Sequence, residues 1–493
     1  MTREVLTKNE GKVRRLCNFC HRYRQVSGRT GHSTIDVLSD DDLLYIFNLY
    51  RRELNDYDKN TWPWHTLVHT CQRWRHVIFA WPRHLDLRLH CKSKTAAAKA
   101  QDIWPTLPIV IHSRPDELHP DDRDDIIDAL EHCHRDQIVQ ITLLHLTRSQ
   151  IERCAAWMNQ PFPVMKSLVL GCYPPCSDDT SVITDAFLGG SAPRLQNVEL
   201  SGFPVLTLNF LSSSPNIVSL CLEDIRGRGA AHISPGQVAT CMSMLKKLEV
   251  FSISFESHIS FSEPTNQRSP LPCTVLPSLA IFCFRGVSEY LEDLISGVDA
   301  PLLEYLHLCL QFFDQPIFDV PQFPQLSQFF HRIEKLRSPL NARIVIFEDR
   351  ITVCMSSSVG GALQLVFFCT GLDRQISLSA QFCAQCLPHA SNLELTRFNH
   401  TQTDQQGTRP WLKIFRPFNS LQIIHVREDE FEVEIARALG ELTGERVAEV
   451  FPMLHTIRLD WFDRVESLVI PLLNPFIDTR QLLDRPVEVQ IVR

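Results

Sequence analysis

The sequence of 493 residues lacks any uninterrupted apolar run long enough to cross a bilayer. Its first thirty residues are polar and basic, with no apolar stretch behind the charges, so we expect no secretory signal. Neither sign of charge dominates, since 49 lysines and arginines against 57 acidic residues leave a net charge of -8. This mild acidity argues against a general nucleic-acid or membrane-surface binder.

Catalytic motifs are also lacking, because the chain has no Walker loop, dinucleotide fingerprint, H-E-x-x-H or G-x-S-x-G element. A dense group of histidines and aspartates around residues 112–136 would allow a metal between Asp128 and His132, one helical turn apart. We expect instead a surface helix over residues 121–134, because acids at its start and histidines at its end complement the helix dipole. The sequence therefore predicts a non-enzymatic protein without a metal or cofactor.

The sequence has no disulfide pattern, although it has 17 cysteines, an odd number. Many are scattered through apolar segments, as are Cys221, Cys283, Cys309 and Cys369. Buried free thiols in a reducing compartment explain this distribution better than a disulfide framework. We therefore expect a cytoplasmic or nuclear protein, and we expect the C-x-x-C pair of Cys383 and Cys386 in the core.

A second C-x-x-C pair lies near the N-terminus, where Cys17, Cys20 and His21 spell C-x-x-C-H. This is the pattern of covalent haem attachment and also half of a zinc site. Haem of this type needs an exported, oxidising setting, and His32 is the one further zinc ligand nearby. We therefore expect residues 1–32 to form a flexible basic tail without a cofactor.

Residues 33–84 contain two stretches whose apolar side chains have helical spacing. Ser39 is the expected N-cap of the first helix, and the three aspartates after it complement the positive helix end. A loop rich in Asn, Asp and Pro follows at 55–63. The second helix is expected at about 64–79.

These two short helices carry more large apolar side chains than they can hide from water. The set is Leu43, Leu44, Ile46, Phe47, Trp64, Trp74 and Trp81. An apolar excess of this kind marks a binding face, or it packs on the following domain. The residues alone leave both explanations open.

The segment resembles the F-box. The matching pattern is L-x-D-D-x-L-L-x-I-F from Leu38, followed by W-x-x-L-V-H-x-C-x-x-W-R from Trp64. The continuation P-R-H-L-D-L-R-L from Pro82 and I-W-P-T-L-P-I-V-I from Ile103 is similar to a large fungal group of F-box/leucine-rich-repeat proteins. The resemblance is strong from residue 34 to about 146 and looser beyond.

The resemblance implies that the helix pair docks onto a Skp-family adaptor, which bridges to a cullin in an SCF-type ubiquitin ligase. F-boxes usually carry proline where this chain has Ser39. Proline would preset the first helical turn, so we expect weaker docking. The docking residues implied are Leu38, Leu44, Ile46, Phe47, Leu67, Trp74 and Arg75, with Trp74 the expected hot spot.

Beyond the helix pair, a pattern with apolar residues at its first, fourth, sixth and ninth positions recurs. Copies start at Ile138, Met165, Leu195, Ile217, Leu245, Leu279, Leu303, Phe418 and Leu454. In several copies proline stands two places before the first position, where we expect it to stop a helix and begin an extended strand. Leucine-rich repeats have this motif at roughly 20–29 residues per unit. The ninth position lacks asparagine, so no Asn ladder joins the turns and the horseshoe should be irregular.

The sequence therefore predicts an α/β fold, with a helical F-box at 33–84 followed by an irregular leucine-rich-repeat solenoid. Residues 85–135 would form a linker and the cap of the repeat domain, and residues 136–493 the repeats. Stacked strands would line a concave parallel sheet. Side chains expected on that concave face are Glu199, Ser219, Glu249 and Arg458. Chance periodicity in a strand-rich domain is the alternative.

The phase of the repeats is lost between Leu310 and His389. Residues 343–347 and 363–368 still have the character of strands. Degenerate repeats or a local insertion would both explain the region.

The expected function is that of a substrate adaptor whose repeats hold an unknown target protein, with neither nucleic acid nor membrane as a partner. The alternative is a leucine-rich-repeat interaction scaffold in which the helix pair only caps the first repeat. In that case Leu44, Phe47 and Trp74 would be buried against residues 85–111.

Overall fold

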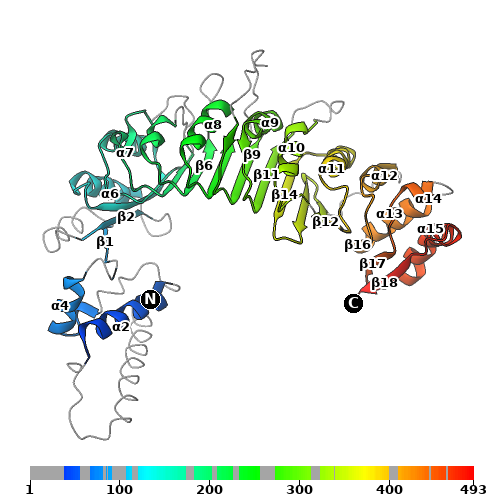
Figure 1. Ribbon diagram of the computed structural model, residues 1–493, viewed down its shortest axis with the longest axis horizontal. Coiled ribbons are helices and arrows are strands. Elements are labelled where there is room, and N and C mark those ends of the chain that lie inside the picture. Colours follow the sequence, from blue (N-terminus) through cyan, green and yellow to red (C-terminus); the bar gives the residue numbers. More distant parts are fainter. Residues whose placement is uncertain are drawn as a thin grey trace, which may run out of the picture. The chain divides into compact units, whose positions relative to one another are not determined.

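The computed structural model describes residues 38–55, 67–81, 85, 87–91, 107–113, 120–173, 183–202, 208–225, 233–255, 273–312, 322–337, 339–398, 409–442, 446–461 and 465–492. The chain divides into two compact units, Met1–His90 and Cys91–Arg493 (Figure 1). The predicted tail at 1–32, with its C-x-x-C-H motif, lies outside the described residues, as does Trp64.

The first unit contains two helices, α2 (Asp40–Asn55) and α4 (Gln72–Ala80). Ser39 caps α2 as predicted, because its hydroxyl accepts a hydrogen bond from the Asp42 backbone N–H at 3.1 Å. The Ser39 N–H in turn donates to the Asp42 carboxylate at 3.0 Å. This reciprocal pair is the capping-box arrangement, with Asp42 in the position usually held by Glu or Gln.

The single helix expected at 64–79 is interrupted, because α4 begins only at Gln72. Leu67 and Val68 belong to a separate helical segment. The chain then becomes extended at Cys71, whose Sγ accepts a hydrogen bond from the Trp74 N–H at 3.4 Å. Cys71 therefore acts as the N-cap of a new helix.

The helix pair has an apolar interior formed by Leu43, Leu44, Phe47, Val77 and Ile78, all buried. The ring of Phe47 meets that of Trp74 edge-on, with centroids 4.9 Å apart. Arg73 links the two helices, since its guanidinium donates to the Leu38 carbonyl at 2.6 Å and to the Asp40 carboxylate at 3.0 Å.

The second unit is a repeat solenoid built around one long sheet. β1 (Leu89–Cys91) contains the boundary between the two units. From there the strands follow in the spatial order β2 (Ile109–Ser113), β3 (Ile138–Leu146), β4 (Ser167–Cys172), β5 (Asn197–Ser201), β6 (Ser219–Ile225), β7 (Val250–Phe255), β9 (Ile281–Gly286), β11 (Tyr305–Gln311), β14 (Ala362–Phe368), β13 (Arg350–Ser357), β12 (Pro339–Ile346), β15 (Asn392–Arg397), β16 (Ile423–Arg427), β17 (Thr456–Asp460) and β18 (Glu488–Val492). The short strands β8 (Thr274–Val275) and β10 (Val298–Asp299) form a separate parallel pair.

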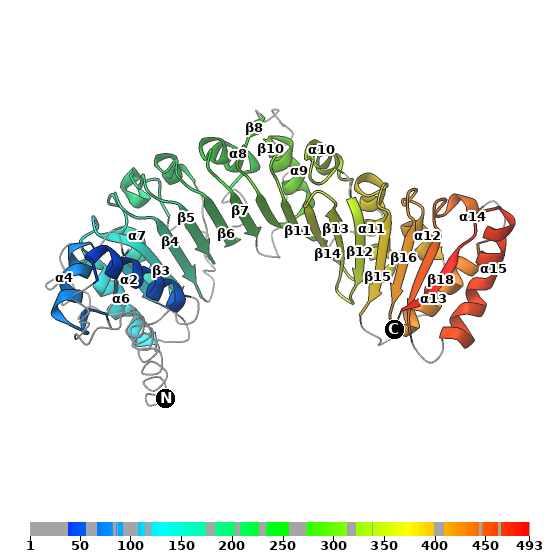
Figure 2. The same ribbon diagram turned by 60° about the horizontal axis from the view of Figure 1, so that its bottom comes forward.

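Helices connect the strands and all lie on one side of this sheet, its convex side (Figure 2). They are α6 (Pro120–His132), α7 (Arg148–Trp157), η2 (Phe187–Gly190), η3 (Asn209–Ser213), α8 (Pro235–Met244), α9 (Ser288–Ser296), α10 (Pro324–Arg332), α11 (Leu372–Cys386), α12 (Arg409–Phe415), α13 (Asp429–Gly440), α14 (Arg446–Glu449), η4 (Val465–Val469) and α15 (Ile470–Leu482). The predicted mixed α/β repeat solenoid is confirmed for this unit, and among the described residues its opposite, concave face is made by the strands.

The core lies between the sheet and the helices. In β5, Val198 and Leu200 are buried while Glu199 between them is half-buried on the other face. The same inward positions of successive strands stack, as with Phe251 and Phe282, whose ring centroids are 5.6 Å apart. Burying a large apolar side chain contributes about 1.5–3 kcal/mol, and stacking makes this core continuous along the array.

In two copies of the repeat, the sequence prediction placed the first position of the pattern three residues too early. In β7 the inward residues are Phe251 and Ile253, because Phe251 pairs in register with Leu220. Glu249 therefore precedes the strand, and its predicted place on the concave strands is wrong. In β16 the inward residues are Ile424 and Val426. The first residue of the preceding turn is apolar in both copies, so the pattern matched one turn upstream.

The prolines have a different role from the one predicted. Each stands second in a hydrogen-bonded turn, as Pro193 does between the Ala192 carbonyl and the Leu195 N–H, 3.1 Å apart. The same turn holds Pro163, Pro215, Pro277, Pro301 and Pro452. The fixed φ of proline suits this position. The residues form a tight corner ahead of each strand, and the expectation of an extended segment is corrected.

The region where the phase is lost contains an antiparallel meander. β12 pairs antiparallel with β13, and β13 pairs antiparallel with β14. As a result β14, rather than β12, lies parallel to β11, and β12 lies parallel to β15. The strand expected at 343–347 corresponds to β12, which ends one residue earlier at Ile346, and the strand expected at 363–368 lies within β14. Strand β13 was not foreseen.

The cysteines of the described residues are free thiols. Cys369, Cys383 and Cys386 are buried as predicted. Cys221, Cys283 and Cys309 are half-buried and stand between inward residues of β6, β9 and β11, so their predicted place in the core is wrong. In the described part of the chain we found no helix that combines the length and apolarity needed to span a membrane.

Candidate functional site

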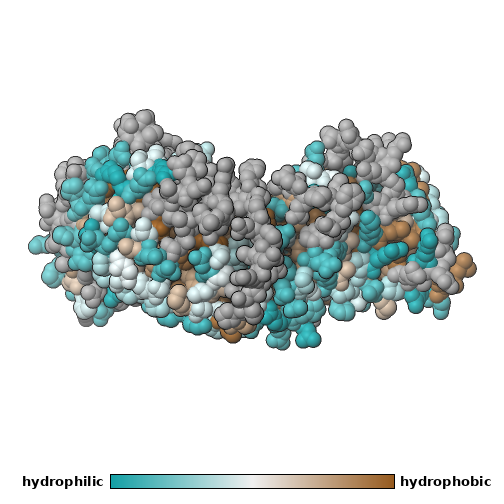
Figure 3. Space-filling model, turned by 90° about the horizontal axis from the view of Figure 1, so that it is seen from above, coloured by the Kyte–Doolittle hydropathy of each residue, from teal (hydrophilic) through white to brown (hydrophobic). Residues whose placement is uncertain are grey.

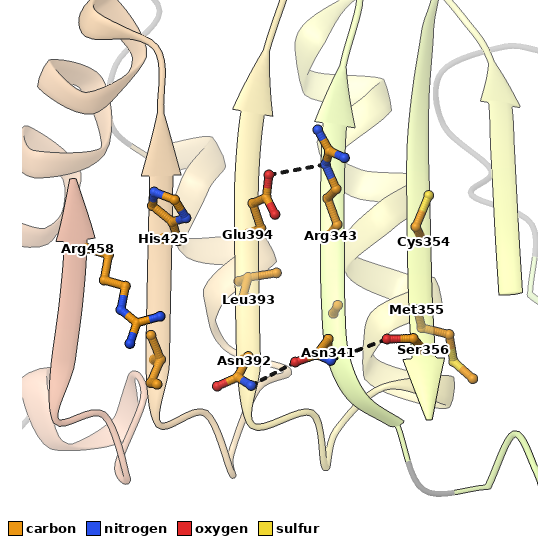
Figure 4. A pocket seen from close by; sticks show the side chains of 12 residues that line it. Asn341, Arg343, Cys354, Met355, Ser356, Asn392, Leu393, Glu394, His425 and Arg458 are labelled. Carbon is orange, nitrogen blue, oxygen red and sulfur yellow. Dashed lines mark hydrogen bonds and ion pairs between the residues drawn. The ribbon is translucent and has the colours of Figure 1, made fainter. Parts of the chain in front are cut away.

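A pocket of about 390 Å³ opens on the concave side of the C-terminal repeats, across β12, β13, β15, β16 and β17 (Figure 4). Its polar and charged lining comprises Asn341, Arg343, Cys354, Ser356, Asn392, Glu394, His425 and Arg458. On the face that Figure 3 shows, hydrophilic side chains and side chains of intermediate hydropathy cover most of the described surface, with hydrophobic ones in smaller areas. The pocket is the candidate site of the solenoid because it gathers polar and charged side chains from five strands.

Sheet register brings these side chains together from distant parts of the sequence. Arg343 pairs with Cys354 on one side and Glu394 on the other. Glu394 pairs with His425, and His425 with Arg458. Because neighbouring strands lie about 4.8 Å apart, the five residues form one row across the concave face.

A chain of ion pairs crosses this row. Glu394 Oε1 forms an ion pair with Arg343 Nε at 3.3 Å and accepts a hydrogen bond from Arg427 Nη1 at 3.2 Å. Arg427 Nε also donates to Asp460 Oδ2 at 3.2 Å, and Asp460 Oδ1 lies 2.8 Å from His425 Nε2. The hydrogen bonds that Arg427 donates to Glu394 and then to Asp460 raise the pKa of Arg427. These side chains are partly exposed, so each pair contributes at most about 1 kcal/mol to stability.

Arg458 stands apart from this chain. Its Nε donates to Gln490 Oε1 at 3.3 Å, and no carboxylate among the described residues pairs with it. Figure 4 shows its side chain running away from Glu394, toward the end of the pocket where Asn392 and Asn341 stand. Its guanidinium is therefore a cation left available to a ligand.

A row of amides lines that end of the pocket. Asn392 Nδ2 donates to Asn341 Oδ1 at 2.7 Å, and Asn341 Nδ2 donates to Ser356 Oγ at 3.3 Å. Each amide nitrogen carries two hydrogens, so each bond leaves one hydrogen for a further acceptor. This end of the pocket is rich in donors.

The thiols of the concave face are not set up as nucleophiles. Burial raises the pKa of Cys354 and that of Cys309. Cys309 Sγ lies 3.4 Å from His307 Nε2, but burial lowers the pKa of His307. Both partners are therefore neutral at pH 7, whereas a catalytic pair needs a thiolate. Within the described residues no group of three or more His, Cys, Asp or Glu could hold a metal ion.

The residues that the F-box resemblance assigns to docking do not form one exposed surface. Leu44, Phe47 and Leu67 are 5%, 1% and 7% exposed. Leu38, Ile46 and Trp74 are half-buried. Arg75 is exposed, and its Nε donates to the Val68 carbonyl at 3.1 Å.

Sequence reasoning missed two large apolar side chains that α2 leaves in solvent. Tyr45 is 66% exposed and Leu49 is 43% exposed. They stand four residues apart and so share one side of the helix. Their spacing relative to the inward Leu44 and Phe47 was the signal that could have separated the two faces.

Of the pocket residues, sequence reasoning placed only Arg458 on the concave face. His425 was hidden by the frame that began three residues early. Arg343 and Glu394 were missed because the repeat phase is lost before them. The turn ahead of β16 carries Asn419 at the place where six other copies carry proline, so proline phasing gave no signal for the frame of this strand.

Comparison with known proteins gives little further. No protein-family model matches the chain, and no curated protein matches it. Among solved structures, the leucine-rich repeat-containing protein LegL7 from Legionella pneumophila aligns with 79% of this chain and 96% of its own, at 11% identity and a TM-score of 0.23. The repeats are therefore assigned from the strand register of this chain itself.

Proposed function

We propose that this protein is a substrate-recognition adaptor of an SCF-type ubiquitin ligase. The helix pair would dock onto a Skp-family adaptor and through it a cullin, and the concave face of the solenoid would hold a target protein. The chain would contribute proximity rather than bond chemistry, by raising the local concentration of the target near a ubiquitin-charged enzyme.

One observation carries the docking half of the proposal. A helix pair that resembles the F-box packs Leu44 and Phe47 inside and leaves Tyr45 and Leu49 exposed one turn apart on α2. Exposed large apolar side chains that share one helix face suit a protein partner. The docking surface therefore includes Tyr45 and Leu49 in addition to the half-buried residues that the resemblance implies.

Co-elution with the adaptor tests this directly. The full chain is mixed with a recombinant Skp-family adaptor and run on size exclusion. We expect a complex, and we expect Tyr45→Asp with Leu49→Asp to abolish it without a change in far-UV circular dichroism. Leu482→Asp is the control, since Leu482 is 87% exposed on α15 in the other unit. A folded wild-type chain that elutes apart from the adaptor would sink the proposal.

The second candidate is an interaction scaffold whose helix pair only caps the first repeat. The burial of Leu44 and Phe47 is the observation that favours it, although the contact of Phe47 with Trp74 places part of that burial within the helix pair. The two candidates separate on removal of residues 1–84. A cap would leave the solenoid markedly less stable when lost, whereas a docking module would leave its melting temperature unchanged.

A further inference from the structure

We propose that the concave pocket binds a single carboxylate side chain, Asp or Glu, of an acidic protein segment, with Arg458 as its counter-ion. This rests on the proposed function in one respect, namely that the solenoid holds a protein. The new element is the group on the target that the pocket recognises, a carboxylate paired with Arg458.

Charge is the first argument. The pocket is lined by two arginines, Arg343 and Arg458, and one carboxylate, Glu394. Glu394 already holds Arg343 at 3.3 Å, and it shares Arg427 with Asp460. The excess is therefore one positive charge, and it is located on Arg458.

The size of that excess selects the kind of anion. A carboxylate carries one negative charge and would neutralise Arg458. A phosphorylated side chain carries about -1.5 to -2 at pH 7 and would leave part of its charge without a partner, because Arg343 and Arg427 are already engaged. The pocket therefore favours a carboxylate over a phosphate.

Hydrogen bonding is the second argument. The free amide hydrogens of Asn341 and Asn392 and the hydroxyl of Ser356 stand at the end of the pocket toward which Arg458 runs (Figure 4). The Asn341 and Ser356 oxygens already accept hydrogen bonds from within this row. A ligand that only accepts hydrogen bonds fits such a site, and an ionised carboxylate is acceptor-only. A lysine or arginine of a partner would meet the Arg458 cation, and of the two amide oxygens here only that of Asn392 accepts no hydrogen bond from within this row.

The probe for this proposal is an array of synthetic decapeptides incubated with the full-length chain. Each acidic member carries a central Asp or Glu, and its matched partners carry Asn or Gln, or phosphoserine, at that place. A charge-assisted hydrogen bond to a partly buried group corresponds to roughly tenfold in affinity. We therefore expect the peptides with a central Asp or Glu to bind roughly tenfold more tightly than their Asn or Gln partners.

Arg458→Gln should abolish the preference, because it removes the cation and keeps most of the side chain. Arg437→Gln is the matched control, an exposed arginine of α13 outside the pocket. Thermal melting of both variants verifies the fold. Equal binding of carboxylate and amide peptides, an unchanged preference in Arg458→Gln, or no peptide bound above background would each overturn the proposal. Stronger binding of phosphoserine members would also overturn it, in favour of a phosphate site.

Adaptor co-elution is measured on the same wild-type preparation. If the wild-type chain forms no complex with the adaptor but still prefers carboxylate peptides, the result counts against the ligase role alone. A retained complex without the preference would count against the pocket alone.

Discussion

Arg480 donates a hydrogen bond from Nη2 to the backbone carbonyl of Leu454 at 2.5 Å, although both lie in the interior of the last repeats. Its Nη1 donates to the Phe451 carbonyl and its Nε to the Arg485 carbonyl, each at 3.1 Å. Phe451 and Leu454 begin and end the turn ahead of β17. Phe451 has a φ of 55°, a conformation that costs a non-glycine residue energy. One buried guanidinium therefore holds a strained turn.

Replacement of Arg480 by Met should destabilise the C-terminal repeats. The buried Leu454 carbonyl would lose its donor, the Phe451 carbonyl would keep only the Leu454 N–H, and the Arg485 carbonyl belongs to an exposed residue that water can reach. A buried carbonyl left unsatisfied costs about 1–3 kcal/mol, and we expect a loss of this size in the free energy of unfolding, measured by urea titration. Hydrogen exchange should rise in β17 and β18 first. Arg437→Met is the control and should change neither; an equal effect of the two variants would contradict the role of the buried guanidinium.

Ser39→Ala should raise the pKa of Asp42. The hydroxyl of Ser39, and then its backbone N–H, lower that pKa by hydrogen bonding to the carboxylate. The carboxylate therefore stabilises the helix start above its unfolded pKa of about 3.9, and this is lost as pH falls through the lower folded value. A carboxyl-detected NMR titration of Asp42 measures the shift. The same Asp42 pKa in wild type and variant would show that the cap does not act on the carboxylate.

Gly361→Ala should disturb the meander. Gly361 lies at the turn into β14, where its carbonyl accepts from the Ser357 N–H at 2.8 Å. A Cβ added there would collide with the backbone carbonyl of Lys335. Overpacking of this kind costs about 1–3 kcal/mol, to be read from chemical unfolding. Val359→Ala in the same turn is the control, because Val359 is exposed; full stability of the glycine variant would refute the close approach.

Glu394→Gln should leave stability nearly unchanged and strengthen binding of acidic peptides. Its ion pairs with Arg343 and Arg427 are partly exposed and are worth less than about 1 kcal/mol each. Removing the carboxylate frees Arg343 and leaves Arg427 paired with Asp460, so the affinity for the acidic decapeptides should rise several-fold in fluorescence anisotropy. Glu334→Gln, in an exposed turn, should have no effect. Weaker binding in Glu394→Gln would argue that Glu394 organises the pocket rather than competing with the ligand.

Local pattern was sufficient to predict most of the individual elements. The alternation around Val198 and Leu200 and the aspartates after Ser39 both depend on neighbouring residues, and both were interpreted correctly. The frame failed at β7 and β16 because Leu245 and Phe418 are apolar residues of the turns, which alternation alone cannot distinguish from the first position of a repeat.

Strand neighbours were beyond prediction in the meander. Nothing near Arg343 in the sequence states that it will lie beside Cys354 and Glu394, since that follows from the reversal at β13. The pocket is a product of that reversal and of the register beyond it. It could not be assembled from motifs, because its members are spread over five strands.

The meander also has a consequence for the order in which a ribosome delivers this chain. In the first repeats, each newly synthesised strand can pair at once with the exposed edge of the strand made before it. β11 ends at Gln311, but the strand that covers it starts only at Ala362. The edge of β11 therefore stays unpaired while β12 and β13 are translated. An unpaired strand edge can form hydrogen bonds with another chain. That interval is the point in biosynthesis at which a chaperone would be most useful to this protein.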